Sequence, residues 1–588
     1  MPGKVFSTSL FLRAVLLIVV LCLPVKCLLG ASCSVVKHPA PSEADKALLA
    51  ADYVKAADLY RAGLASHPGD AELTIGLVHS LLHQQKVQEA ADAVKTSLAL
   101  APNSAALITL RGEVELRQGI PWLAGQTALE SDKLDLCNPR NHLLLADLER
   151  LSSQYATSRK QLGFAHLLDP EDPEIRGEWI HTLSLKQRIA ETEAYLSAPR
   201  GDDEEDLRHW RMYLESLKKM EAEPHKACHL VSPTATAEIP FDVLMRDATH
   251  IRAFRLEVKL NGRTFRLQID TGAGGLLVSR SVAQRAGLKA FSQTEMGGIG
   301  DKGFMPGYTA YADSIRIGNL EFQDCSIEVI DSRNVVEDVD GLIGMDVFSQ
   351  FLVTLDYPMR KLLLGPLPPR PGETAVAAPS LNTSNADQDE SGVSDEPAKE
   401  AGEDKPAAQG TDSGLKAPVA GSSTSAPAQN AAVQKTPSHG PYDRYIAPEM
   451  KDYTPVYRVG HNLILPAAIN GKEIKLFILD TGAFATTISP QAAREVTKVY
   501  SDDRQHVKGI SGEVEKVYSA DEVTFNFAHL SQKVHGVVAF DTSKISKHVG
   551  MEISGFLGAN TLNLLTIHID YRDGLVKFDY DPNRGYRF

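Results

Sequence analysis

Cysteine is scarce in this sequence, with 6 residues among 588. Three of the six lie in or beside the N-terminal leader, at Cys22, Cys27 and Cys33. The other three are far apart in separate segments, at Cys137, Cys228 and Cys325. This spacing argues against a disulfide-rich scaffold, and we expect the three distant cysteines to be buried apolar residues.

Clusters of cysteine and histidine are also absent, although there are 18 histidines. His79 and His83 have the spacing that places two side chains on one face of a helix, but only Ser80, Leu81 and Leu82 lie between them. Because no acidic residue accompanies the pair, a packed or solvated helix face is favoured over a zinc site. We expect no metal and no cofactor.

The N-terminus has an apolar run that is too short to cross a membrane. It covers residues 14–25, after Lys4 and Arg13, whereas a helix needs about 20 residues to span a bilayer core of ~30 Å. The pattern is typical of a signal peptide over residues 1–32. We therefore expect export to the periplasm or cell envelope, with secretion left open.

The end of this leader allows three outcomes. Residues 30–32, Gly-Ala-Ser, are compatible with cleavage, and Cys33 follows at the position that a bacterial lipoprotein would acylate. Gly30 stands where lipoprotein signals prefer leucine, so simple cleavage is favoured over a lipid anchor at Cys33. An uncleaved signal anchor is the third outcome, and membrane contact is expected only through the anchor or the signal.

Basic residues are outnumbered, with 61 Lys and Arg against 75 Asp and Glu. The net charge of −14 argues against nucleic acid as a partner.

Large apolar residues are nearly missing from residues 367–440, which are rich in Pro, Ala, Ser, Gly, Asp and Glu. Such a segment cannot bury enough surface to fold, and we expect a disordered linker there.

The chain does contain the sequence Asp-Thr-Gly-Ala twice, at residues 270–273 and 480–483. An Asn-Gly pair precedes the aspartate by 9 residues in the first copy and by 10 in the second, with alternating apolar residues between. This pattern predicts that a β-hairpin carries each aspartate.

Further landmarks follow each aspartate in the same order. They are a helix-compatible stretch (279–288 and 489–496), a glycine-rich segment (296–300 and 509–512), two apolar residues with a glycine (342–344 and 556–558), and a strand-like run with Asp-Tyr (356–357 and 570–571). So many landmarks in one order indicate an internal repeat.

These landmarks resemble the retropepsin-like branch of the aspartic peptidases, over roughly residues 240–366 and 441–588. The resemblance implies catalytic roles for Asp270 and Asp480. It implies active-site support from the neighbouring residues Thr271, Gly272, Thr481 and Gly482. It also implies that the glycine-rich segments are flaps over a bound peptide, formed by Gly297, Gly298, Ile299 and Gly300 and by Gly509, Ile510, Ser511 and Gly512.

The chemistry explains why two aspartates are needed. Hydrolysis of an amide by water requires a base for the water and an acid for the carbonyl oxygen or leaving nitrogen. Two carboxylates about 3 Å apart cannot both ionise, so one keeps a proton and the pair supplies both roles. The glycines allow close approach, and the threonine hydroxyls can lock the two turns together.

The fourth residue of each motif bears on the pH of activity. Both copies have alanine there, Ala273 and Ala483, where pepsin-like enzymes often place a hydroxyl residue. Loss of a donor to the charged carboxylate raises its pKa. We therefore expect a mildly acidic optimum.

Two of these motifs also have an ordinary structural interpretation. A single Asp-Thr-Gly is usually an ordinary turn, but two copies with matching surroundings disfavour that interpretation. Residues 298–303 also match the Gly-X-Gly-X-X-Gly dinucleotide fingerprint. No strand-to-helix unit surrounds them, so we interpret them as flap.

Residues 41–225 have a helical repeat pattern. The pairs Ala56-Ala57 and Ala90-Ala91 are 34 residues apart, as are Pro68 and Pro102, and further prolines continue the series at positions 139 and 170. This period resembles the tetratricopeptide repeat, with helix pairs over 44–66, 71–100 and 104–134. An unrelated array of helical hairpins is the alternative. Either solenoid would offer a concave face to a protein partner.

The sequence therefore predicts a multidomain protein, with an all-α helical repeat solenoid followed by two mainly-β retropepsin-like lobes. The expected function is an exported aspartic endopeptidase that acts on a peptide or protein substrate, with the repeats recruiting a partner or substrate. The alternative is a non-catalytic peptide-binding or assembly scaffold that keeps the protease fold. Pairing of the lobes within one chain is favoured over pairing between chains, because the linker raises their effective concentration.

Overall fold

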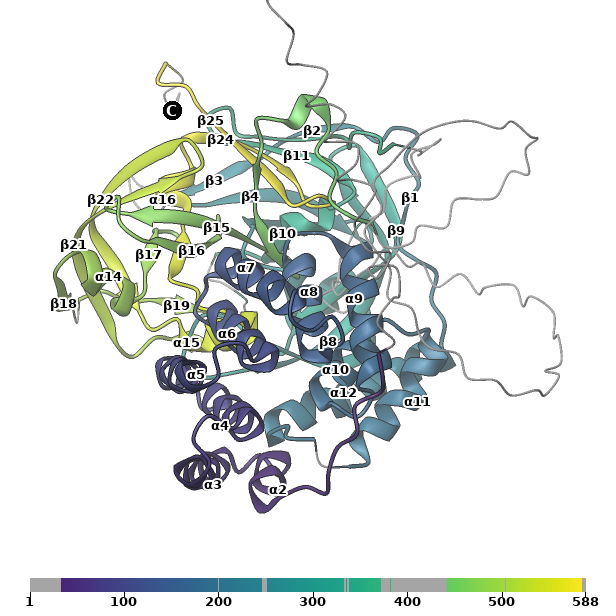
Figure 1. The fold of residues 1–588 in the computed structure, drawn as a ribbon. Coiled ribbons are helices and arrows are strands. Elements are labelled where there is room, and N and C mark those ends of the chain that lie inside the picture. The colour runs from purple at the N-terminus through teal and green to yellow at the C-terminus, as the bar shows by residue number, and fades with distance from the viewer. Residues whose placement is uncertain are drawn as a thin grey trace, which may run out of the picture. The chain divides into compact units, whose positions relative to one another are not determined.

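The computed structural model describes residues 33–198, 200–245, 251–332, 335, 338–371, 381, 442–502 and 504–583. The expected signal peptide, most of the expected linker and the last five residues lie outside this part of the chain. The described residues fall into a helical region and two lobes of β-sheet (Figure 1).

The helical region consists of antiparallel helices in sequence order. They are α2 (Glu43–Leu49), α3 (Tyr53–Ser66), α4 (Ala71–His83), α5 (Val87–Leu100), α6 (Ala105–Arg117), α7 (Pro121–Asp132), α8 (Pro139–Leu151), α9 (Tyr155–Leu168), α10 (Pro173–Ile180), α11 (Leu185–Leu196) and α12 (Glu204–Ala222). The first three pairs, α2–α3, α4–α5 and α6–α7, coincide with the three pairs predicted from the sequence. Pro68 and Pro102 follow the ends of α3 and α5, whereas Pro139 is the first residue of α8.

Local sequence explains why these helices begin and pack as they do. Asp70 and Ser104 cap α4 and α6 by accepting a hydrogen bond from a backbone N–H of the first turn. Small residues allow the helices to approach: Ala56 and Ala90 are fully buried, and a Cβ on Gly76 would overlap the ring of Tyr60. The alanine pairs that show the 34-residue period in the sequence thus lie where neighbouring helices pack closely.

The first lobe is built on a nine-stranded sheet in the order β1-β9-β6-β10-β5-β4-β8-β7, with β3 paired to β4. Its elements are β1 (His229–Leu230), β3 (Asp242–Met245), β4 (Ile251–Leu260), β5 (Arg263–Asp270), β6 (Leu276–Ser279), α13 (Arg280–Ala286), β7 (Lys289–Met296), β8 (Met305–Ile317), β9 (Leu320–Ile330), β10 (Gly341–Gly344) and η2 (Met345–Phe348). The β4–β5 hairpin carries Asp270 at its end, as predicted.

The second lobe repeats this plan in an eight-stranded sheet, in the order β14-β15-β16-β23-β17-β22-β21-β18, with a separate hairpin β19–β20. Its elements are β14 (Tyr457–Val459), β15 (Asn462–Ile469), β16 (Ile474–Leu479), β17 (Thr487–Ile488), α14 (Pro490–Val496), β18 (Val499–Ser501), β19 (Lys508–Gly509), β20 (Gly512–Glu513), β21 (Val517–Phe527), β22 (Leu530–Phe540), α15 (Ser543–Val549), β23 (Gly555–Leu557) and α16 (Ala559–Leu562). The prediction of two mainly-β lobes is confirmed.

The two lobes share a third sheet of six strands, in the order β13-β25-β24-β11-β12-β2. Its strands are β2 (Ala237–Pro240), β11 (Phe351–Asp356), β12 (Lys361–Pro366), β13 (Thr454–Pro455), β24 (Leu565–Asp570) and β25 (Leu575–Tyr580). The two central strands, β11 and β24, pair antiparallel, with Leu352 opposite Asp570 and Asp356 opposite Thr566. The two Asp-Tyr landmarks of the sequence repeat thus end the strands that join the lobes.

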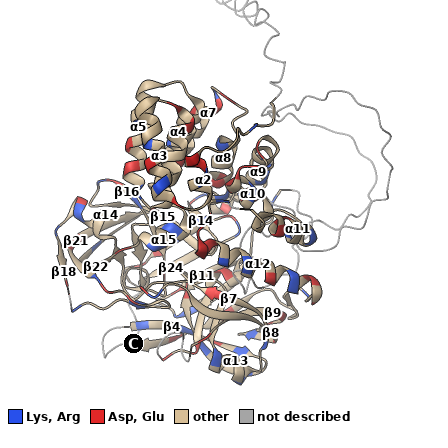
Figure 2. Cartoon of the chain, turned by 90° about the horizontal axis from the view of Figure 1, so that it is seen from below, with Lys and Arg blue, Asp and Glu red and all other residues tan. Residues whose placement is uncertain are grey.

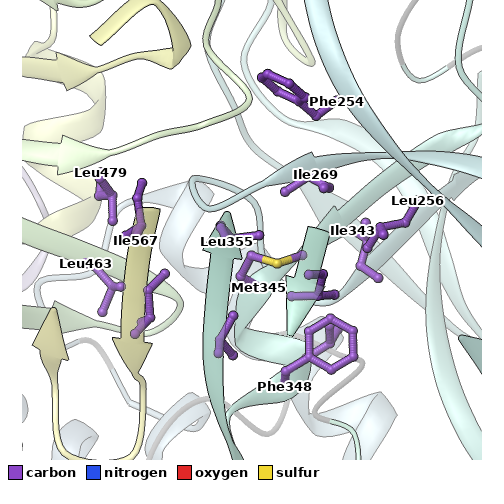
Figure 3. Close-up of a cluster of buried hydrophobic side chains, with 14 of the residues drawn as sticks. Phe254, Leu256, Ile269, Ile343, Met345, Phe348, Leu355, Leu463, Leu479 and Ile567 are labelled. Carbon is purple, nitrogen blue, oxygen red and sulfur yellow. The ribbon is translucent and has the colours of Figure 1, made fainter. Parts of the chain in front are cut away.

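One hydrophobic core continues from lobe to lobe beneath this sheet. Figure 3 shows Leu355 and Ile567 on the adjoining strands, between Ile343 and Met345 of the first lobe and Leu463 of the second. Together with many neighbours these side chains are almost completely buried. Burial of a leucine-sized side chain is worth about 1.5–3 kcal/mol, so this shared core holds the lobes in one arrangement.

Several residues inside the expected linker range pack against the lobes. Leu367 and Leu381 are 7% and 4% exposed, and Leu381 belongs to the shared core. Arg370 pairs with the buried Asp573 at 2.7 Å and stacks over the ring of Tyr442. The remaining residues between 372 and 441 lie outside the described part of the chain.

The prediction that the distant cysteines are simple buried residues was wrong. Cys228 and Cys325 form a disulfide across 97 residues of sequence, and Cys137 is disulfide-bonded as well. The pairing of β1 with β9 places His229 opposite Gln323, which brings Cys228 and Cys325 together. Sequence separation gave no sign of this, because a sheet joins residues that are far apart in the chain.

Removal of the Cys228–Cys325 bond by a Cys228→Ser/Cys325→Ser double substitution should lower the free energy of unfolding by about 2–4 kcal/mol. The bond closes a long loop and fastens β1, which has only two residue pairs with β9. Denaturant unfolding under non-reducing conditions measures the difference. Equal midpoints for the wild type and the double variant would contradict a stabilising role.

No helix among the described residues is both long and apolar enough to cross a membrane.

Candidate functional site

The two repeated aspartates are held by equivalent strands. Asp270 is the last residue of β5, and the parallel strand β10 pairs with it through Gly344. Asp480 follows β16, and its N–H donates a hydrogen bond to the carbonyl of Leu557 at 3.0 Å. The apolar-apolar-glycine landmark of each copy therefore supports the strand that delivers the aspartate.

Each carboxyl group packs against the glycine of the other lobe's turn. A Cβ placed on Gly272 would lie 2.7 Å from Cγ of Asp480, and one placed on Gly482 would lie closer still to Cγ of Asp270. Only glycine allows this approach. The crossed packing brings the two carboxyl groups into a single site at the lobe boundary.

The threonines of the two motifs lock the turns to each other. The N–H of Thr271 donates to Oγ1 of Thr481, and the N–H of Thr481 donates to Oγ1 of Thr271, both at 3.0 Å. Oγ1 of Thr271 also donates to the carbonyl of Leu479 at 2.7 Å. Both threonines are at most 3% exposed. These buried bonds fix the two aspartate turns in register.

The environment keeps a proton on the pair. Burial, followed by the neighbouring charge of Asp480, raises the pKa of Asp270 well above its usual range. Burial also raises the pKa of Asp480, against the lowering effect of hydrogen bonds from Ala483, Asp270 and Gly482. The two carboxyls therefore titrate as a pair that holds one proton at mildly acidic pH.

Backbone groups replace the hydroxyl donor that the alanines lack. The N–H of Ala483 donates to Oδ1 of Asp480 at 2.8 Å, and the N–H of Gly482 donates to the same oxygen at 2.9 Å. In the first lobe the N–H of Gly272 donates to Oδ1 of Asp270 at 2.9 Å. Both aspartates thus accept backbone hydrogen bonds that favour the charged form, from Gly272 and Ala273 at Asp270 and from Gly482 and Ala483 at Asp480.

The two predicted flaps are hairpins whose tips meet. The first is β7–β8 with residues 297–304 at its tip, and the second is β19–β20. The N–H of Ser511 donates to the carbonyl of Ile299 at 3.0 Å, and the N–H of Lys302 donates to the carbonyl of Ser511 at 2.9 Å. A Cβ on Gly300 would overlap the backbone of Ser511. The flaps are closed in this structure.

The isoleucines at the two tips pack into opposite lobes. Ile510 of the second flap contacts a first-lobe cluster that includes Ala273, Leu277 and Leu342. Ile299 of the first flap contacts a cluster of the second lobe and the repeat helices.

The flaps are not identical, because Gly300 of the first corresponds to Ser511 of the second. Gly297, Gly298, Gly509 and Gly512 complete the tips, and at Gly298 a Cβ would lie 2.9 Å from Cβ of Ile510.

The last repeat helix, α12, lies along the outer strand of the first flap (Figure 2). Arg208 of α12 pairs with Glu295 at 3.1 Å, and Nζ of Lys219 donates to the carbonyl of Phe291 at 2.6 Å. Just beyond the helix, the ring of His225 stacks on Tyr311. The repeat region therefore touches the flap over most of the length of β7.

Other repeat helices contact the second lobe. The N–H of Glu552 donates to the carbonyl of Arg117 at 3.0 Å, and Oγ1 of Thr157 donates to Asp443 at 2.9 Å. The repeat region is thus anchored on the second lobe while α12 holds the flap of the first.

Sequence reasoning missed a pair of polar supports behind the aspartate turns. Both oxygens of the buried Asp346 accept from the N–H of Gly275, at 3.1 and 3.2 Å, and burial raises the pKa of Asp346 to about 7. In the second lobe Oδ1 of Asn560 accepts from the N–H of Thr486 at 2.7 Å. Each support stands two residues after the glycine of the landmark, so a comparison of the copies could have found them.

Two more side chains near the dyad carry no signal in the sequence. Nε2 of Gln268 donates to the carbonyl of Gly482 at 3.0 Å. Nε2 of His461 lies 3.2 Å from the carbonyl oxygen of Gly272. Gln268 stands at a polar position of an alternating strand and would be expected at the surface, yet it is 7% exposed.

The two histidines with helical spacing have other partners. Nε2 of His79 lies 2.9 Å from Glu113, and the ring of His83 stacks on Tyr53. Within the described residues no group of three or more His, Cys, Asp or Glu side chains is arranged to hold a metal.

Comparison with known proteins places these features in a class. Residues 256–347 and 465–561 match the family model described as aspartyl protease, and residues 47–114 match the tetratricopeptide repeat. Both segments of the protease match contain one copy of the Asp-Thr-Gly motif. The chain thus has two segments similar to aspartyl proteases, behind a segment similar to tetratricopeptide repeats, and the resemblances stated from the sequence are confirmed.

One curated relative is the DNA damage-inducible protein 1 of Neurospora crassa. It is 22% identical over 218 residues, which are 33% of this chain and 48% of the relative. The chain therefore spans about half the length of that protein. A solved aspartic proteinase from Irpex lacteus has a TM-score of 0.31 and 11% identity, over 59% of this chain and 98% of the proteinase chain.

Proposed function

We propose that this protein is an aspartic endopeptidase that uses Asp270 and Asp480 as one catalytic dyad. The crossed packing of each carboxyl group on the opposite glycine is the observation that carries the proposal. It supports a shared site in which one proton held by the two carboxyls lets them act as acid and base. The substrate is an extended peptide that lies between the lobes once the flaps open, and the reaction needs no cofactor.

The arrangement supports acid–base catalysis in two steps. In the first, the carboxylate of Asp480 takes a proton from water while the carboxyl of Asp270 gives its proton to the carbonyl oxygen, and the water oxygen bonds to the carbonyl carbon. In the second, Asp480 gives its proton to the leaving nitrogen, Asp270 regains one from the tetrahedral intermediate, and the C–N bond breaks. Both carboxyls end in their starting states.

Cleavage of a mixed peptide library by residues 33–588 across pH 3 to 8 tests the activity. Internal cleavage that a statine-type transition-state mimic blocks would support the endopeptidase. A folded protein that cuts nothing at any pH would favour the alternative, a peptide-binding or assembly scaffold that keeps the protease fold.

Activity should be greatest at mildly acidic pH. The dyad works with one proton, so the rate falls on the acid side as Asp480 gains a proton and on the alkaline side as Asp270 loses one. Burial raises the pKa of both groups. The acid limb and the alkaline limb of the pH–rate profile therefore both lie at higher pH. A pH profile of kcat/KM measures the limbs, and a maximum near pH 2 to 3 would contradict the expectation.

Export is part of the same proposal. The Cys228–Cys325 disulfide supports it, because disulfides persist in oxidising compartments such as the periplasm. Gly30 stands where lipoprotein signals prefer leucine, which argues against a lipid anchor. We therefore favour a cleaved signal peptide and a periplasmic or secreted protein over a lipid anchor at Cys33. Mass spectrometry of the mature N-terminus from cells decides between these forms.

The helical repeats are proposed to recruit a partner or substrate and to affect the first flap. Their contact with both the second lobe and β7 supports this role, since a change in the repeats would reach the flap through α12. Opening of the flap must strain or break these contacts.

An Arg208→Ala/Lys219→Ala double substitution should loosen the first flap. It removes the pair with Glu295 and the bond to the carbonyl of Phe291, so amide hydrogen exchange in β7 should become several-fold faster. Cleavage of bulky substrates should rise with it. Lys95→Ala on the exposed side of α5 is the matched control. Unchanged exchange in β7 would show that α12 does not restrain the flap.

A further inference from the structure

The carbonyl groups of the two dyad glycines are each held by a side chain from the opposite lobe. Gln268 of the first lobe donates its Nε2–H to the carbonyl of Gly482 at 3.0 Å. His461, at the turn between β14 and β15 of the second lobe, lies with Nε2 at 3.2 Å from the carbonyl oxygen of Gly272. A carbonyl only accepts, so the imidazole donates. Both bonds cross the lobe boundary.

These carbonyls belong to the residues that control the position of both carboxyl groups. The N–H of Gly482 donates to Asp480 of its own motif at 2.9 Å, and its α-carbon supports the carboxyl of Asp270. Gly272 has the mirrored relation, with an N–H bond to Asp270 and packing against Asp480. Rotation of either glycine's backbone would therefore move one carboxyl group and release the other.

The threonine lock leaves this rotation unrestrained. Its bonds end on the backbone N–H groups of Thr271 and Thr481 and on the carbonyl of Leu479, one residue or more before each glycine. Glycine has the widest backbone freedom of any residue. A hydrogen bond to the glycine carbonyl adds to the bonds that the N–H groups of Gly272, Gly482 and Ala483 make with the aspartates, and it restrains the turn from the opposite lobe.

The two restraints did not arise from the repeat itself. The second-lobe residue that matches Gln268 is Ile478, also two residues before its aspartate, and it is 2% exposed. Isoleucine has no donor, and the second lobe supplies His461 from a different place in the fold. Two unrelated side chains that make the same bond at equivalent carbonyls indicate that the bond serves the site.

The imidazole is suited to this role as a neutral donor. Burial, followed by the nearby His548, lowers the pKa of His461 to about 4, and Arg458 acts in the same direction. The groups that face it are therefore His548, Arg458 and the dyad loop itself. His461 is neutral over the mildly acidic range in which the dyad is expected to work.

We propose that Gln268 and His461 are positioning residues of the aspartic dyad, which fix the glycine backbone of the opposite turn and through it the separation of Asp270 and Asp480. They act through the glycines and need not contact the substrate. The kinetic test of this role rests on the proposed peptidase function. The test by NMR depends only on the geometry of the site.

The kinetic test uses His461→Leu and Gln268→Leu, which keep approximate size and remove the donor. Each should lower kcat by about 10- to 100-fold, because small displacements of catalytic groups cost this much, while KM stays within about twofold of wild type. His461→Gln restores a donor and should recover most of the loss. His67→Leu and Gln126→Leu, at exposed positions of the repeats, are the matched controls, and melting curves confirm that all variants fold.

Titration of the dyad carboxyls by ¹³C NMR tests the effect of the bonds to the glycine carbonyls without measuring catalysis. His461→Leu and Gln268→Leu should shift the two carboxyl titrations relative to wild type, and the controls should not. If wild type cuts no peptide but these shifts occur, the proposed function fails and the positioning role stands. A rise in KM with kcat and titrations unchanged would assign the residues to substrate contact, and unchanged kinetics and titrations would also overturn the proposal.

Discussion

Asp270→Asn and Asp480→Asn should each reduce peptide hydrolysis at least about a thousandfold. An amide can neither take a proton from water nor give one to the carbonyl oxygen, so either change removes one of the two roles of the dyad. The crossed packing makes the two lobes equal contributors, and neither carboxyl can replace the other. Cleavage of a peptide identified with the wild type measures the loss.

Stability provides the control for this result. Both carboxyls have a raised pKa, so their charged forms are disfavoured in the folded protein. The asparagine variants should therefore melt at or above the wild-type temperature near neutral pH. Asp58→Asn, on an exposed helix face, should leave activity unchanged. Substantial activity in either dyad variant would mean that the lobes do not share one catalytic site.

Gly482→Ala should reduce activity by about 100-fold or more without changing any ionisable group. The new methyl group would overlap the carboxyl of Asp270, which must move away from Asp480. A displacement of about 1 Å is enough for a loss of this size. Overpacking should also lower the free energy of unfolding by about 1–3 kcal/mol. Gly272→Ala should act in the same way through Asp480.

Two glycines elsewhere serve as matched controls. A Cβ on Gly163 or Gly365 would meet no atom within 4 Å, so alanine there should leave kcat and KM unchanged. If Gly482→Ala were as active as these controls, the close approach of the two turns would be dispensable. Kinetics and denaturant unfolding of the four variants separate the effect on the dyad from a general effect of alanine.

The sequence predicted those features that depend on local pattern. The Asp-Thr-Gly turns, their hairpins, the flaps and the 34-residue helix period could be recognised because each lies within a short stretch. The supports at Asp346 and Asn560 lie in matched positions of the two copies, so a closer comparison of the copies would have revealed them.

Other features could not be predicted because they join distant parts of the chain. The Cys228–Cys325 bond depends on the pairing of β1 with β9. Gln268 and His461 reach the dyad only because the lobes face each other, and nothing in their own neighbourhood marks them. The contact of α12 with the flap likewise follows from the packing of the repeats on both lobes.

The unequal flap tips have a genetic consequence. In a peptidase built from two identical chains, one codon change alters both halves of the active site, so every improvement on one side is repeated on the other. Here Gly300 and Ser511 are encoded separately, although they occupy matching places. Each flap tip can therefore be altered independently within one gene, and the two flaps can diverge further by single mutations.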